Sequence, residues 1–319
     1  MRIPLRIPSS SEAFDLVGLG ENSLDFLTVL AEPPAPDSKQ RLQRFARMAG
    51  GQIATALAAA ARLGCRARYV GSFGDDDLGA MARDALMREG VDTSAARVVR
   101  QATNRFAVIL VDARSGQRAV LWDVDPALTM TAADVPQAAV TSGRMLLVDA
   151  SDVAASTQAA KYARAAGVPT MIDVESVKPG ITDLLQQIDV IVAAQSLPTA
   201  LTGDEHLGRA LSTMARDLGA SIVTVTLGGD GSLTWTRGQE IRTPAFPIDC
   251  VDSTGAGDVF RGAFAAACLR MHDRDGDLED ALVYANAAAA LNCRALGAQG
   301  ALPTADEVIR LLLSAAHRV

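Results

Sequence analysis

The sequence predicts an α/β protein whose main sheet is mostly parallel and covered by helices on both faces. Short, nearly continuous apolar runs lie at residues 144–149, 170–173, 189–193 and 221–227. Ala-rich segments of helical length separate them, as at residues 153–166. Apolar runs of this kind are typical of strands buried on both faces, and their alternation with helices favours parallel neighbours.

A second observation adds a smaller sheet to this architecture. Residues 97–121 alternate loosely between apolar and polar side chains, and residues 113–117 (ARSGQ) suit a hairpin turn. Hairpin strands do not belong to strand-helix-strand repeats. We therefore expect one large domain over residues 1–319, elaborated by a separate β structure.

Length and composition fit a globular protein with a large core. The chain has 319 residues, of which 49% are hydrophobic and 21% charged. No uninterrupted apolar run is long enough to span a membrane, and the first residues lack the apolar centre of a signal peptide, so we expect a cytoplasmic protein. The net charge of −7 argues against nucleic acid as the main partner.

Two common kinds of site are disfavoured by spacing. The four cysteines, Cys65, Cys250, Cys268 and Cys293, are scattered and are interpreted as small core residues, not as a zinc site or a disulfide framework. None of the lysines follows a glycine-rich loop in the GxxxxGK[ST] pattern, which excludes a P-loop nucleotide site.

The most informative stretch is residues 248–269, IDCVDSTGAGDVFRGAFAAACL. We expect a short apolar strand from residue 248, a glycine turn at residues 252–257, and a helix from Asp258. The first N–H groups of a helix lack intrahelical partners and its dipole adds positive charge there, so this turn predicts an anion site. Small residues let a phosphate approach the backbone closely.

Asp258 is a carboxylate in the first turn of that helix. Such a group can accept the proton of a hydroxyl that attacks a phosphoryl group, while the N–H groups stabilise the developing charge. The alternative from the residues alone is an Asp that caps the helix beside glycines that only turn the chain.

The run DSTGAGDVF resembles the C-terminal signature of the ribokinase-like (PfkB) carbohydrate kinases. The resemblance extends from residue 17 to residue 303. It implies a three-layer sandwich with a small β-sheet lid, and ATP-dependent phosphorylation of a hydroxyl on a sugar or sugar-like molecule. It further implies that Asp258 is the base and that Gly255, Ala256, Gly257 and Asp258 form the anion hole.

The N-terminal strand is expected at residues 14–20. Gly18 and Gly20 could begin a dinucleotide fingerprint, but Ser23 stands where its third glycine belongs. In the resembled family a carboxylate just beyond this strand binds sugar hydroxyls, which points to Asp25. The alternative is an Asp in an ordinary turn.

Gly50 and Gly51 precede an Ala-rich helix expected to run to about residue 63. They resemble the N-terminal signature of the family, in which two glycines precede an Asn that contacts the substrate. Here Gln52 takes the place of that Asn, with a longer reach. The resemblance therefore implies substrate-binding roles for Gly50, Gly51 and Gln52.

Insertions at about residues 27–48 and 97–125 are expected to form the lid, which would exclude water from the transferred phosphoryl group. Arg105 is a candidate substrate ligand on this sheet, because a phosphorylated sugar needs a cation. The alternative is a solvated side chain. By resemblance, the lid also implies a homodimer.

The nucleotide site implied by the resemblance comprises Thr226, Gly228 and Gly231, at the end of a strand, and Asn286, in a helix expected at residues 278–291. The glycines would admit ATP and Thr226 would hydrogen-bond it. The alternative for this segment is a plain β-hairpin into residues 233–236.

Metal binding shows one departure from the family pattern. Many members have Asn-x-x-Glu after the strand at residues 189–193, and that Glu helps organise Mg²⁺. The corresponding residues are Ala194, Gln195, Ser196 and Leu197, so the acid is missing. The nucleotide and water could hold Mg²⁺, Glu175 could substitute, or catalysis could be weakened.

Potassium is a further cofactor implied by the resemblance, through Asp252 and Thr254 beside the anion hole.

Two other functions stay open. A catalytically impaired member could act as a sugar or nucleotide sensor, in keeping with the missing acid. A nucleoside kinase is also possible, although an aromatic content of 4% offers few stacking platforms.

Overall fold

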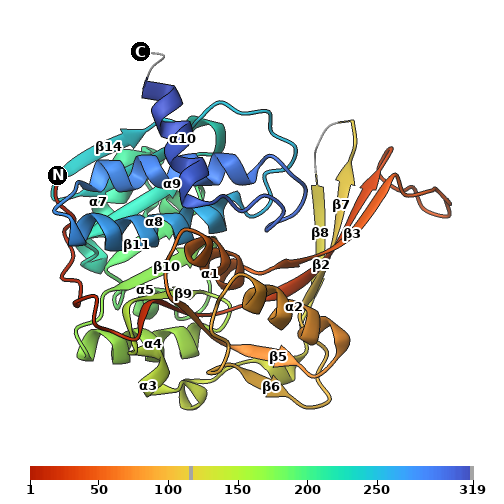
Figure 1. The fold of residues 1–319 in the computed structure, drawn as a ribbon, viewed down its shortest axis with the longest axis horizontal. Helices are drawn as coiled ribbons and strands as arrows, with labels where there is room; N and C mark the ends of the chain where they lie inside the picture. Colours follow the sequence, from red (N-terminus) through yellow and green to blue (C-terminus); the bar gives the residue numbers. More distant parts are fainter. Residues whose placement is uncertain (115–117, 317–319) are drawn as a thin grey trace.

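A computed structural model of the protein describes residues 1–114 and 118–316. Its centre is an eight-stranded sheet in the order β14-β13-β12-β11-β10-β9-β1-β4 (Figure 1). The strands from β12 to β4 are parallel, and β13 and β14 are antiparallel to their neighbours. The bounds are β14 (Gln239–Thr243), β13 (Ser232–Thr236), β12 (Ile222–Thr226), β11 (Val190–Ala193), β10 (Thr170–Val174), β9 (Gly143–Asp149), β1 (Phe14–Leu19) and β4 (Ala67–Val70).

Helices cover both faces of this sheet, which gives the three layers expected. Because successive side chains of a strand point to opposite faces, the apolar strands contribute side chains to two separate hydrophobic cores. One core is built with α1 (Gln52–Arg62), α2 (Asp77–Arg88), α8 (Ala256–Asp273), α9 (Leu278–Asn292) and α10 (Ala305–Ala316). The other is built with α3 (Gln137–Val140), α4 (Val153–Ala165), α5 (Ile181–Leu185), α6 (Leu197–Thr202) and α7 (Leu207–Leu218).

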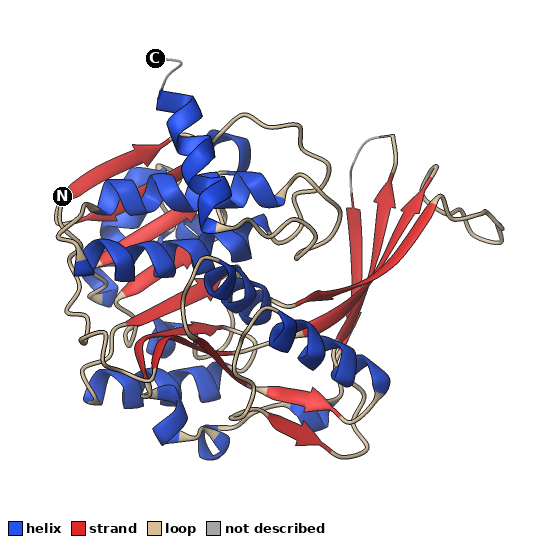
Figure 2. Cartoon of the chain, viewed as in Figure 1, coloured by secondary structure: helices blue, strands red, loops and turns tan. Residues whose placement is uncertain are grey.

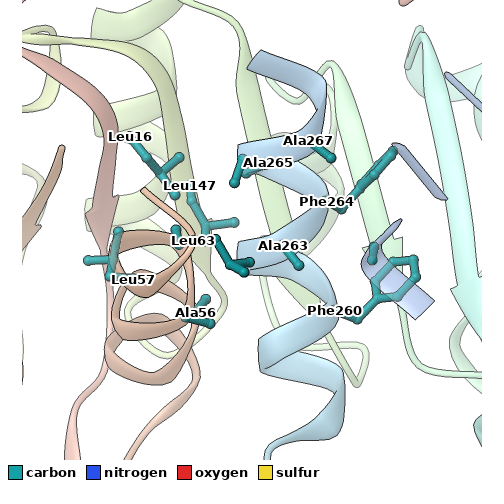
Figure 3. Close-up of a cluster of buried hydrophobic side chains, with 14 of the residues drawn as sticks. Leu16, Ala56, Leu57, Leu63, Leu147, Phe260, Ala263, Phe264, Ala265 and Ala267 are labelled. Atoms are coloured by element: carbon teal, nitrogen blue, oxygen red, sulfur yellow. The ribbon is translucent and has the colours of Figure 1, made fainter. Parts of the chain in front are cut away.

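The first core packs α1 tightly against α8. Figure 3 shows members of this cluster from β1, β9, α1 and α8, among them Leu16, Leu147, Ala56 and Ala263. A Cβ atom at Gly262 of α8 would lie 2.0 Å from the carbonyl oxygen of Ala56 on α1. The small residues of these helices thus allow a close approach of their backbones, which fixes where α8 begins relative to the sheet.

A four-stranded sheet stands beside the main body, in the order β3-β2-β7-β8 (Figures 1 and 2). Its strands are β2 (Ser23–Leu30), β3 (Arg44–Gly50), β7 (Phe106–Asp112) and β8 (Arg118–Asp123). This sheet therefore begins at Ser23, earlier than residue 27, where the lid was expected to start. Residues 97–99, placed in the lid by the sequence, instead form β6 (Arg97–Val99), which pairs with β5 (Ser72–Gly74) in a sheet of their own.

Three local predictions differ from the structure or lie beyond it. The strand expected from residue 248 is wrong: residues 244–250 form no regular structure, because no described strand lies beside them to pair with. Cys250 is exposed and is not a core residue. The predicted turn at residues 113–117 includes residues 115–117, which lie outside the described part of the chain; the flanking strands pair antiparallel.

None of the described helices is both long enough and apolar enough to cross a membrane.

Candidate active site

The N-terminus of α8 has the geometry of an anion site. Gly255 precedes the helix with φ 74° and no side-chain cap, and a Cβ atom there would lie 2.6 Å from backbone atoms of Ala298. Within the described residues, the N–H groups of Gly255, Gly257 and Asp258 have no hydrogen-bond acceptor. The N–H of Ala256 donates to the carbonyl of Ser253 at 3.2 Å, so three of the four donors stay free and the fourth is used locally.

Asp252 holds the turn that leads into α8. Its Oδ1 accepts hydrogen bonds from the Thr254 N–H (2.9 Å) and hydroxyl (2.7 Å), and its Oδ2 accepts one from the Gly297 N–H (2.8 Å). The Asn292 amide donates to the Ala298 carbonyl at 3.0 Å from the other side. Asp252 and Thr254, which the resemblance connects with potassium, thus lie together and order the turn.

Asp258 lies in a cluster of buried charges. Arg261, one turn along α8, donates to Asp258 Oδ1 at 3.1 Å, and its other terminal nitrogen lies 2.6 Å from Asp173 Oδ1 at the end of β10. Arg261 and Asp173 are 4% and 1% exposed, so one cation lies between two carboxylates away from water. Burial raises the pKa of Asp258 to about 7, against the opposing effect of Arg261, and burial also raises the pKa of Asp173.

Asp25 lies on β2 and faces the same site. Its Oδ1 accepts the Ser23 hydroxyl at 2.6 Å, and burial raises its pKa. A Cβ atom at Gly50 would lie 2.2 Å from Asp25 Oδ2, and Gly51, with φ 89°, lies against the backbone of Asn22. The glycine pair therefore makes room for the Asp25 carboxylate at the start of α1.

Glu21 is a buried acid of this site that could not be found by the sequence motifs above. It lies two residues beyond the end of β1, and its carboxylate lies 3.3 Å from Arg105 and near the backbone N–H of Gln52, which lowers its pKa. Burial, together with the nearby Asp149 charge, raises the pKa of Glu21 to about 7. An acid at the carboxyl end of a parallel strand is the signal that could have found it. Gln52 and Arg105, which the sequence predicts as substrate ligands, both lie beside Glu21.

A cavity of about 230 Å³ opens between the end of the main sheet and the small sheet. Glu21, Asn22 and Ser151 line it from the main sheet side, and Arg105 and Trp122 line it from the small sheet. The Arg105 guanidinium lies over the Trp122 ring at 4.7 Å. Lys178 completes the wall and donates to the Ala150 carbonyl at 2.8 Å.

The residues predicted for the nucleotide gather farther along the same carboxyl edge of the sheet, around the end of β12. Thr226 ends β12, and residues 228–230 form a short 3₁₀ turn into β13, so the hairpin alternative describes the backbone. Gly228 has open space around it, whereas a Cβ atom at Gly231 would lie 2.0 Å from the Thr243 carbonyl. Asn286 of α9 donates to the Ser232 hydroxyl at 3.0 Å, so it lies beside this turn.

No acid occupies the positions after β11, because residues 194–197 are Ala-Gln-Ser-Leu. Glu175 is exposed just after β10, and its charge raises the pKa of Asp258. Among the described residues, however, no group of three or more His, Cys, Asp or Glu side chains could hold a metal ion.

The fold and the site together are those of a ribokinase-like α/β protein. They combine a helix N-terminus with free N–H groups, a carboxylate in the first turn of that helix, and a small sheet across a polar cavity. The model of the pfkB family carbohydrate kinases matches residues 14–305. The chain belongs to the pfkB family of carbohydrate kinases.

Similar proteins cover almost the whole chain. A ribokinase of Haemophilus influenzae is 27% identical over 93% of this chain and 98% of its own length. An ATP-dependent ribose-1-phosphate kinase of Halopiger xanaduensis is 34% identical over 88% of this chain and 91% of its own. The structure of Arabidopsis thaliana ribokinase complexed with ribose and ATP superimposes with a TM-score of 0.82 at 28% identity, covering 94% and 99% of the two chains.

Proposed function

We propose that the protein transfers the γ-phosphoryl group of ATP to a hydroxyl of a small sugar-like acceptor bound between Asp25 and Asp258. The observation that carries this function is the position of Asp258, a carboxylate with a pKa of about 7 beside three unpartnered N–H groups at one helix N-terminus. A base with a pKa near the working pH combined with donors for developing negative charge suits phosphoryl transfer.

In this mechanism, Asp25 accepts hydrogen bonds from acceptor hydroxyls and orients one of them toward α8. Asp258 takes the proton of that hydroxyl as its oxygen bonds to the γ-phosphorus. The bond from the γ-phosphorus to the bridging oxygen breaks, and ADP leaves with the electron pair. The N–H groups of Gly255, Gly257 and Asp258 stabilise the charge on the transferred group. Arg261 holds the Asp258 carboxylate in place.

We propose that the turn with Thr226, Gly228 and Gly231 and the side chain of Asn286 bind the nucleotide. The described residues do not provide a set of carboxylates that fits Mg²⁺. Mg²⁺ would therefore enter with the phosphates of ATP and its water, with Glu175 as the nearest exposed acid that follows β10. Potassium beside Asp252 and Thr254 belongs to the same proposal, and both carboxylate oxygens of Asp252 already accept protein hydrogen bonds.

A homodimer through the small sheet is also part of the proposal. Phe45 of β3 is 52% exposed and Leu121 of β8 is 58% exposed. The register places both on the face that also carries Phe26. Exposed apolar side chains gathered on one sheet face are typical of an interface.

The test is ADP release with ATP, Mg²⁺ and K⁺ against free ketoses, aldoses, sugar acids, sugar phosphates and nucleosides. Sugar phosphates are included because Arg105 and Lys178 line the cavity. Turnover with one class supports the kinase and identifies its acceptor. ATP binding without turnover across the panel would contradict it and favour a sensor, the alternative that the missing acid at residues 194–197 motivates.

A further inference from the structure

Arg118 joins the small sheet to the turn before α8. Its guanidinium donates to the Ser253 hydroxyl at 3.1 Å, across 135 residues of sequence. Ser253 in turn accepts the Ala256 N–H, so the contact lies next to the free N–H groups of the anion site. In Figure 1 the first end of β8 lies beside the loops that precede α8 and follow α9.

The register of the small sheet places Arg118 on the face that looks into the site. Asp25 is opposite Ala107, and Ala107 is opposite Trp122, which lines the cavity of about 230 Å³, called the acceptor cavity below. Arg118 precedes Trp122 by four residues and therefore shares its face, about 13 Å along the strand. Strand β8 thus spans from the acceptor cavity at Trp122 to the anion site at Arg118.

Among the residues that the structure describes, no carboxylate lies within ion-pair distance of the Arg118 guanidinium. Within residues 1–114 and 118–316, its bond to the neutral Ser253 hydroxyl is the single polar contact of the guanidinium. By contrast, Arg114, just after β7 in the same hairpin, lies 3.6 Å from Glu32 and 3.7 Å from Asp112. An unpaired guanidinium beside a helix N-terminus suits an oxyanion with several acceptor atoms.

We infer that Arg118 is a further catalytic residue, which leaves Ser253 and binds oxygens of the γ-phosphoryl group when ATP occupies the site. This inference rests on the proposed function. Its position at the Ser253 end of β8, remote from the acceptor cavity, assigns it to the phosphoryl donor and not to the sugar. Because it is carried by the small sheet, the cation reaches the phosphoryl group only when this sheet covers the site.

Arg118→Ala tests the inference in two measurements. The first is affinity for the β,γ-imido analogue of ATP and for ADP by calorimetry: we expect about a tenfold loss for the imido analogue and no change for ADP, because only the former has a γ-phosphoryl group. The second is kcat with the acceptor found in the panel, which should fall on the order of 100-fold, as for the loss of one charge-stabilising donor.

Arg114→Ala is the matched control, since it removes an arginine of the same hairpin whose charge is already paired; both its affinities and kcat should stay at the wild-type values. Arg118→Lys should recover part of the loss. Equal affinity of Arg118→Ala and wild type for the imido analogue, or a kcat within threefold of wild type, would overturn the inference. A wild-type protein without turnover would instead contradict the proposed function, while the binding comparison would still decide the role of Arg118.

Discussion

The chemistry of the site depends on one carboxylate, that of Asp258, whose surroundings shift its pKa in opposite directions. Burial raises the pKa of Asp258, and the adjacent charge of Arg261 favours its ionised form. The result is a pKa of about 7, where a carboxylate can both lose and accept a proton near neutral pH.

Replacing Asp258 with Asn should abolish most turnover while leaving the fold and nucleotide binding intact. Asn keeps the size of the side chain but cannot accept the proton, and a general base usually contributes roughly 100 to 10,000-fold. We expect kcat to fall by at least about 100-fold, with the affinity for ADP unchanged. A rate equal to that of the wild type would show that Asp258 is not the base.

The pH dependence follows from the same carboxylate. The base must be ionised, so kcat/KM should rise with pH through about 7. Arg261→Met removes the cation that favours the ionised form, and the acidic limb should then move to higher pH. A pH profile of both proteins tests this, with Glu21→Gln as the control because Glu21 has a similarly raised pKa.

The same Arg261→Met variant should also be less stable. It would leave Asp258 and Asp173 buried without their cation, and removing one partner of a buried ion pair costs about 3–5 kcal/mol. Urea denaturation at pH 8, above the pKa of about 7 of Asp258, measures the loss. An acidic limb that stays in place, or unfolding at the wild-type midpoint, would mean that Arg261 does not act on Asp258.

At the scale of elements, the contact between α1 and α8 positions the anion site. The two helices approach so closely that Gly262 leaves no room for a side chain beside the Ala56 carbonyl. Since Asp258 lies one turn before Gly262, a shift of α8 also moves the base and the free N–H groups.

Gly262→Ala should therefore destabilise the protein although alanine favours helices. The added methyl would lie 2.0 Å from the Ala56 oxygen, and overpacking of this kind costs about 1–3 kcal/mol. Gly229→Ala is the control, because nothing lies within 4 Å of its Cβ position. Thermal unfolding of both variants compares them, and an equal melting temperature would contradict the packing argument.

At the scale of the whole molecule, the small sheet has an exposed apolar face. If two copies pair through it, Phe45→Glu combined with Leu121→Glu should yield a monomer, because charged groups buried in an interface are costly. Light scattering after size-exclusion chromatography measures the mass. Met87→Glu, which changes an equally exposed side chain on α2, should stay dimeric. A monomeric wild type would rule out the dimer.

Much of the fold could be predicted from local patterns. Apolar runs predicted β1, β9, β10, β11 and β12 to within one or two residues, because a strand buried on both faces has an unmistakable composition. The start of α8 could also be predicted, since Gly255 and Asp258 are local signals. The strand expected from residue 248 failed because its apolar residues have no neighbouring strand to pair with.

The sequence by itself determined the fold class, the kinase family and the position of Asp258, because each depends on periodicity or on a short contiguous motif. Only the tertiary structure decided which distant charges meet: Arg261 with Asp173, Arg105 with Glu21, and Arg118 with Ser253. The physical reason is that Coulomb interactions and burial depend on distance in space, which the chain sets by stacking strands and helices, and not on separation along the sequence.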